Sequence, residues 1–186
     1  GPASDPRAPA PAASTWPLTG GPALRNTTAV QDGFAGALGT YSWRLRDASV
    51  TWTATYTAAL APSQSFSSFG FDARRWDASP SPAYTVEYSL DGGTSFTTAT
   101  SIGTSGVLDN AAFGNSSDWS SFSQSLTSPQ GLAANQFVVR LSATGGERIM
   151  VDNFTATVIP EPATWTLIGI GSAFLLWRKR RRVAVA

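Results

Sequence analysis

The stretch VTWTATYTAAL, residues 50–60, decides the fold class of this chain. Apolar side chains, among them Trp52, Ala54 and Tyr56, alternate with the threonines at positions 51, 53, 55 and 57. A period of two places the two sets on opposite faces of a β-strand, one face buried and the other solvated. The stretch therefore predicts a sheet with one buried side.

The same alternation runs through residues 84–90 and is followed by Asp91-Gly92-Gly93 and then by residues 94–100. Asp-Gly between two such runs predicts a hairpin with a type I′ turn, which needs positive φ. Further strands are predicted at residues 66–72, 119–126, 136–142 and 148–158, with Gly145-Gly146 marking a hairpin between the last two. No helical period is visible before residue 160. We therefore expect an all-β ectodomain of β-sandwich or jelly-roll-like type, followed by one C-terminal transmembrane helix.

The last predicted strand changes parity at Asp152-Asn153. Ile149 and Val151 are apolar on one parity, whereas Phe154 and the apolar residues after it lie on the other. One inserted residue produces such a change, so we expect a β-bulge here. A bulge could also aim Asp152 at a structural Ca²⁺, which needs six to eight oxygen ligands. The bulge without an ion is the favoured interpretation, and no other cofactor is expected.

The composition excludes several classes of function. There is no Cys and no His, so disulfides, thiolate metal sites and a Ser-His-Asp triad are all excluded. Residues 1–159 hold eight arginines and eleven carboxylates, a net charge of −3, whereas five of the thirteen basic residues crowd into residues 178–182. The body lacks the basic patch that a nucleic-acid surface needs.

The chain divides by composition into four parts. Residues 1–22 hold six prolines and are predicted to be an extended Pro/Ala-rich linker, although Trp16 and Leu18 are candidates for the start of the fold. Residues 23–158 form the expected ectodomain, residues 159–182 the sorting and anchor segment, and residues 183–186 a short tail. The sequence starts at Gly1, and we expect that an export signal was removed or that the chain belongs to a longer precursor.

An uncharged apolar segment fills residues 163–177. As a helix it would extend about 22 Å, less than the roughly 30 Å of a bilayer core, so it would cross a thinned bilayer with Trp165 and Trp177 at the two interfaces. The predicted anchor residues are Trp165, Leu167, Ile168, Ile170, Phe174, Leu175, Leu176 and Trp177. A stop-transfer cluster follows, made of Arg178, Lys179, Arg180, Arg181 and Arg182. The positive-inside rule places this cluster in the cytoplasm and the body outside.

The order of the features at this end is specific. Pro160-Glu161-Pro162, then a short apolar span, then a terminal Arg cluster resembles the PEP-CTERM sorting signal. The resemblance implies a Gram-negative host that makes exopolysaccharide, and recognition by an exosortase, a membrane-embedded processing enzyme of which this chain is the substrate. It implies an inner-membrane-anchored precursor that is then moved to the cell surface or the extracellular matrix of a biofilm. A plain C-terminal membrane anchor is the alternative.

The ectodomain itself carries weaker signals. We expect a non-catalytic structural or glycan-associated role, because Trp76 and Trp119 stand in polar, turn-like surroundings where an indole could stack on a sugar ring. Trp43 and Trp52 are further aromatic candidates, but Trp52 lies on an apolar strand face and favours the core. The alternative is a glycan-active enzyme that uses paired carboxylates. The candidates are Asp72, Asp77, Glu87, Asp109, Asp118 and Asp152, but no spacing singles out a pair, so no enzyme is expected.

Overall fold

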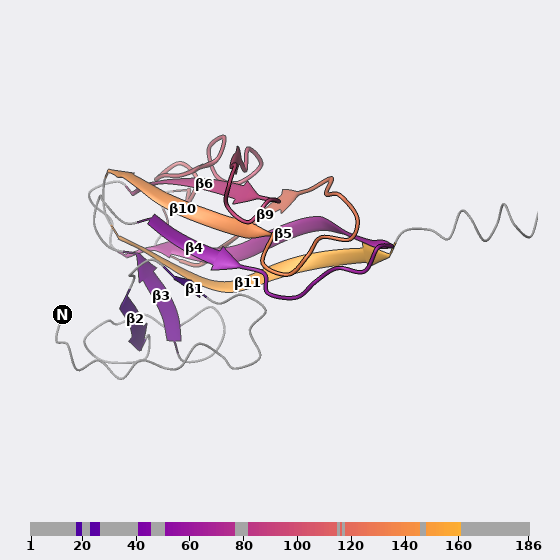
Figure 1. Cartoon of the computed structure of the whole chain (residues 1–186). Helices are drawn as coiled ribbons and strands as arrows, with labels where there is room; N and C mark the ends of the chain where they lie inside the picture. Colours follow the sequence, from indigo (N-terminus) through magenta and orange to yellow (C-terminus); the bar gives the residue numbers. More distant parts are fainter. Residues whose placement is uncertain are drawn as a thin grey trace, which may run out of the picture.

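The computed structural model describes residues 18–19, 23–26, 41–45, 51–76, 82–114, 116, 118–145 and 148–160. In these residues all regular secondary structure is β, and two sheets lie face to face (Figure 1). The strands are β1 (Leu18–Thr19), β2 (Ala23–Asn26), β3 (Tyr41–Leu45), β4 (Thr51–Thr55), β5 (Gln64–Arg75), β6 (Ala83–Ser89), β7 (Thr97–Thr98), β8 (Val107–Leu108), β9 (Ser120–Ser125), β10 (Val138–Gly145) and β11 (Ile149–Pro160).

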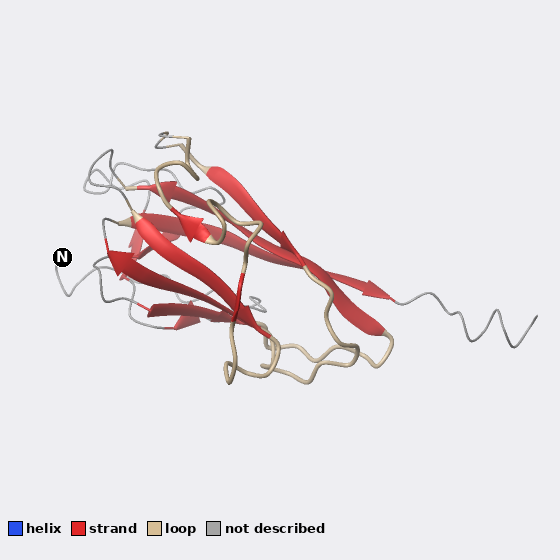
Figure 2. Ribbon diagram, turned by 90° about the horizontal axis from the view of Figure 1, so that it is seen from above, coloured by secondary structure: helices blue, strands red, loops and turns tan. Residues whose placement is uncertain are grey.

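Both sheets are antiparallel. Sheet A has the order β1-β4-β10-β6-β7, with β8 also paired to β6, and sheet B has the order β2-β3-β11-β5-β9. The longer strands alternate between the sheets along the chain, as in jelly rolls, so sequence neighbours such as β4 and β5 lie in different layers (Figure 1). Figure 2 shows the strands and the loops that connect them from a second direction. The predicted β-sandwich is confirmed.

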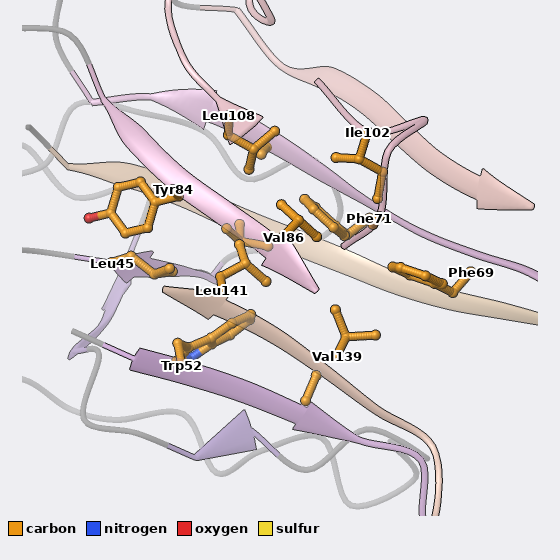
Figure 3. Close-up of a cluster of buried hydrophobic side chains, with 14 of the residues drawn as sticks. Leu45, Trp52, Phe69, Phe71, Tyr84, Val86, Ile102, Leu108, Val139 and Leu141 are labelled. Atoms are coloured by element: carbon orange, nitrogen blue, oxygen red, sulfur yellow. The ribbon is translucent and has the colours of Figure 1, made fainter. Parts of the chain in front are cut away.

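The inward faces of the two sheets meet in one aromatic core. Trp52 of sheet A is fully buried (Figure 3). Its ring lies 5.9 Å from that of Trp43 and 5.2 Å from that of Phe154, both on sheet B. Farther along the sandwich, Phe66 and Phe137 meet at 4.5 Å. Trp52 is thus a core residue, and the partly buried Trp43 packs against the core.

The fold-deciding stretch forms a shorter strand than its period suggests. Strand β4 ends at Thr55. Beyond it, the N–H of Tyr56 donates to the carbonyl of Phe137 and the N–H of Leu60 donates to that of Leu132. The residues after Thr55 therefore form a loop that runs beside the loop of residues 132–137. Leu60 in this loop remains buried.

The two predicted hairpins have different outcomes. Strands β6 and β7 do pair, and Gly92 and Gly93 have the predicted positive φ, 76° and 91°. Tyr88 pairs with Thr97, so residues 89–96 form a connection longer than a two-residue hairpin loop. The hairpin predicted at Gly145-Gly146 is wrong. Strand β10 pairs with β4 and β6, whereas β11 pairs with β3 and β5, so this connection crosses between sheets.

The predicted bulge in the last strand is confirmed. The pairing of β11 with β5 shifts register between Asp152 and Thr155, and Asn153 there has φ of 51°. As a result Phe154 points into the core beside Phe71, with the ring centroids 4.9 Å apart. A second shift follows Thr157, where β5 holds the additional residue.

Both ends of the described chain are paired in the sandwich. Leu18 pairs with Ala54, within the range expected to be a linker, and Pro160 pairs with Gln64. The expected transmembrane helix lies outside the described residues. Within the part of the chain that the structure covers, no helix is long and apolar enough to cross a membrane.

Candidate functional site

One end of sheet B gathers the charged and aromatic side chains on its outer face, which points away from sheet A. We call this region the distal face. The register aligns Arg44 of β3, Met150 of β11 and Arg74 of β5 in one row across the sheet. Met150 is fully buried although it lies outside the core cluster, and Arg44 is 4% exposed. The row is therefore covered at its centre and carries a guanidinium at each side.

Trp76 follows the end of β5 and is half-buried. The guanidinium carbons of Arg44 and Arg148 lie 4.7 and 5.3 Å from its ring centroid, within cation–π range. The N–H of Trp76 donates to the carbonyl of Arg148 at 3.0 Å. Backbone and ring are thus both fixed, and Trp76 is built into the distal face.

Trp119 precedes the edge strand β9 and is also half-buried. The guanidinium of Arg74 lies 6.0 Å from its ring centroid, at the outer limit of a cation–π contact. Burial lowers the pKa of the Arg74 guanidinium, and the nearby charge of Asp118 opposes this effect. The structure therefore brings Trp119 together with a cation and an exposed carboxylate.

The next row of the distal face is a hydrogen-bonded polar group. Asp72 of β5 lies opposite Asp152 of β11 and Ser121 of β9. Its two carboxylate oxygens accept from the Ser121 hydroxyl at 2.6 Å and from the Asn153 side-chain amide at 3.1 Å. The N–H of Asn153 donates to Asp152 at 2.7 Å. Because Ser121 and Asn153 are exposed, this group presents oriented donors and acceptors to the medium.

The other carboxylates considered for catalysis are separated from this face or engaged elsewhere. Glu87 of sheet A accepts two hydrogen bonds from Arg140, at 2.9 and 2.7 Å. Asp109 accepts from the Thr104 hydroxyl and from the N–H of Ala112. Asp77 lies outside the described residues. Among the residues that the structure describes, no three His, Cys, Asp or Glu side chains lie close enough to hold a metal ion.

The two indoles are predicted from the sequence, but the arginines that contact their rings are not. Arg44, Arg74 and Arg148 come from three strands or their ends, and only the register brings them together. The sequence held one usable signal, the parity of β5. Arg74 and Asp72 share a parity opposite to that of the core residue Phe71.

The sorting motif begins where the sandwich ends. Pro160 is the last residue of β11 and pairs with Gln64 of β5. Glu161, Pro162, the predicted anchor and the basic cluster follow outside the described residues. Residues 158–182 match the family model of the PEP-CTERM protein-sorting motif. The chain carries a PEP-CTERM sorting signal. The PEP-CTERM motif thus overlaps the end of the last strand, and no linker separates it from the sandwich.

The sandwich has solved structural likenesses of low similarity. A CBM22-1 xylan-binding domain from Paenibacillus barcinonensis Xyn10C has a TM-score of 0.49 at 9% identity, over 78% of this chain and 87% of that one. A family 22 carbohydrate-binding module of Clostridium thermocellum Xyn10B has a TM-score of 0.48 at 15% identity, over 80% and 88%. These likenesses assign no function to this PEP-CTERM chain. No curated protein matches its sequence.

Proposed function

We propose that this chain is an exported, non-catalytic surface protein, which an exosortase sorts and processes at Pro160-Glu161-Pro162. The observation that supports this proposal is the junction between the sandwich and the sorting motif. The sandwich ends in a paired strand at the first residue of a motif whose family model matches residues 158–182. The apolar residues from Trp165 to Trp177 then hold the precursor in the inner membrane, and Arg178 to Arg182 keep the C-terminus in the cytoplasm.

The distal face supports the second part of the proposal, a contact with exopolysaccharide at the cell surface or in the matrix. Sugars are bound by indole rings together with oriented carboxylates, amides and hydroxyls. Trp119, Asp72 and Asn153 supply these groups on one side of sheet B. We propose Trp119 as the contacting indole and Trp76, held by Arg44 and Arg148, as its structural support.

The distal face also lies far from the sorting motif. Strand β11 runs from Ile149, next to Arg148, to Pro160. Twelve residues at the usual strand rise span about 36 Å. An anchored precursor would therefore hold the distal face well away from the bilayer, where extracellular glycans are accessible.

The sorting step is tested by Glu161→Ala in the native host, with an N-terminal epitope on both proteins. We expect wild type outside the cells in a shortened form and the variant as a full-length chain in the membrane fraction. Asp118→Ala, which also removes one carboxylate, is the matched control and should be sorted like wild type. Equal export and shortening of the Glu161→Ala protein would contradict the proposal.

A further inference from the structure

Three chain segments at the end of the sandwich from which the chain leaves carry no charged residue. They are residues 56–63, residues 126–136 and residues 158–160, and we call them together the proximal platform. The sequence carries no charge from residue 48 to 71, from 119 to 139 or from 153 to 160. Other surfaces of the sandwich, the distal face above all, carry arginines and carboxylates.

Backbone hydrogen bonds join the three segments into one surface. The N–H of Leu60 donates to Leu132 at 2.8 Å, and the N–H of Gly131 donates to Gln64 at 3.2 Å. Gln64 in turn pairs with Pro160. The loops of the platform therefore lie beside the point where the last strand ends (Figure 1).

The exposed side chains of the platform are uncharged, and most of the apolar ones are small. The small ones include Ala58, Ala59, Ala61, Pro62, Pro129, Ala133 and Ala134. Polar side chains lie among them, at Thr57, Ser63, Thr127, Gln130 and Asn135. Ile159 is 44% exposed, and among the described residues it is the large hydrophobic side chain that is classed as exposed. Leu60 and Leu132 lie beneath this layer, 7% and 6% exposed, and hold the loops to the core. Such a surface can enter the boundary between lipid headgroups and acyl chains without desolvating a charge.

The charged groups nearest the platform lie at its margin and are hydrogen-bonded or paired. The hairpin loop of Asp91 adjoins the platform through the hydrogen bond from the N–H of Gly92 to Gln136. The Asp91 carboxylate accepts from the hydroxyls of Ser89 and Ser95, so it faces its own loop. Farther along sheet A, Glu87 is paired with Arg140.

We propose that the proximal platform rests on the outer surface of the lipid bilayer while the protein is anchored. The inference depends on the proposed anchoring and adds a lipid-binding surface to it. Only Glu161 and Pro162 separate Pro160 from the uncharged segment 163–177. Two extended residues span at most about 7 Å, so an inserted segment brings the platform to the headgroups.

The absence of Cys permits a direct test with single-cysteine variants of the full chain. Ala59→Cys and Ala134→Cys report on the platform, and Ala111→Cys is the matched control. Ala111 is an exposed alanine next to Asn110, whose amide oxygen accepts from Arg75 toward the distal end. Each variant carries an environment-sensitive fluorophore and is reconstituted in phosphatidylethanolamine–phosphatidylglycerol vesicles, with or without a headgroup nitroxide lipid.

We expect blue-shifted emission and severalfold stronger nitroxide quenching at positions 59 and 134 than at position 111. Equal, water-like emission at all three positions, in protein that floats with the vesicles, would overturn the docking and leave the anchoring intact. Protein that fails to float would overturn the anchoring and the docking together. A blue shift that follows protein density but not the nitroxide lipid would assign the surface to a second copy and overturn lipid docking.

An added charge provides a second readout. Ala59→Asp with Ala134→Asp should restore water-like emission to a label at Ala61→Cys, because a carboxylate at the headgroup boundary must stay hydrated. Ala111→Asp should leave that emission unchanged. Circular dichroism and the unfolding midpoint show that both charge variants remain folded, since all three positions are exposed. An unchanged blue shift in the double Asp variant would contradict the proposal.

Discussion

Asn153 combines a left-handed backbone conformation with a side-chain hydrogen bond. Its φ is 51° and its amide donates to Asp72 at 3.1 Å. Asn tolerates this conformation better than other non-glycine residues, and a β-branched residue tolerates it poorly. We expect Asn153→Val to lower the free energy of unfolding by about 1–2 kcal/mol, and Asn153→Gly to lower it less. Urea unfolding measures both, and equal losses would show that the backbone conformation is not the cause.

Asp91 gives the hairpin loop a pH dependence. Hydrogen bonds from Ser89 and Ser95 hold the pKa of its carboxyl well below the ordinary value of 3.8. Since the folded-state pKa is the lower one, the stabilisation is complete above pH 3.8 and is lost as the pH falls toward the folded-state pKa. The difference in unfolding free energy between wild type and Asp91→Asn should therefore shrink with acidification below pH 3.8.

Ser95→Ala is the matched control for this prediction. It removes one hydroxyl donor and keeps the carboxylate, so the difference between Ser95→Ala and wild type should also narrow in acid. Thermal unfolding at a series of pH values measures both variants. A difference between wild type and Asp91→Asn that stays constant down to the lowest pH would contradict the assignment.

At the scale of elements, Gly70 controls the pairing of the edge strand β9. A Cβ at Gly70 would lie 2.6 Å from the carbonyl oxygen of Phe122, a backbone atom that can move only with its strand. We expect Gly70→Ala to cost about 1–3 kcal/mol and to raise amide exchange along β9. Ser68→Ala, on the same strand and opposite Ser125, should leave both nearly unchanged. Normal protection of β9 in Gly70→Ala would refute this reading.

Much of the architecture was predictable because a strand with one buried face has apolar residues at every second position of its sequence. The alternation at residues 84–90 gave β6, and the parity change at Asp152-Asn153 gave the bulge. The alternation in Tyr41–Leu45 was also present but is only five residues long, and β3 was missed. Gly145-Gly146 marks a turn, but a turn does not specify whether the next strand joins the same sheet. That depends on which inward faces pack together.

The candidate site was predictable only in part. Trp76 and Trp119 were selected because polar neighbours surround them in sequence. The cations on their rings come from Arg44, Arg74 and Arg148, and no local pattern shows that these will meet. The proximal platform was visible in sequence as long charge-free runs, but its meaning required the knowledge that the runs converge beside Pro160.

In the molecule as a whole, the two ends of the sandwich differ in charge. The end of the distal face next to Arg148 lies about 36 Å along β11 from the sorting motif and the uncharged platform. This arrangement suits a precursor that is held at a membrane and presents its distal end outward.

Glycan contact at the distal end is tested with exopolysaccharide purified from the host. We expect Trp119→Ala to weaken binding by about threefold to tenfold, the range of a lost aromatic contact. Trp76→Ala, which loses its contacts with Arg44 and Arg148, should mainly lower the unfolding midpoint. Affinity electrophoresis of the folded variants measures the difference. Unchanged binding by Trp119→Ala would remove this indole from the site.

The most direct measurement of the central claim is the intact mass of the wild-type protein recovered from outside the cells, from hosts with and without their exosortase. We expect the recovered chain to lack the basic cluster from Arg178 to Arg182 when the enzyme is present, and to remain full-length and membrane-bound when it is absent. Recovery of a chain that still carries Arg178 to Arg182 from outside enzyme-containing cells would contradict the account.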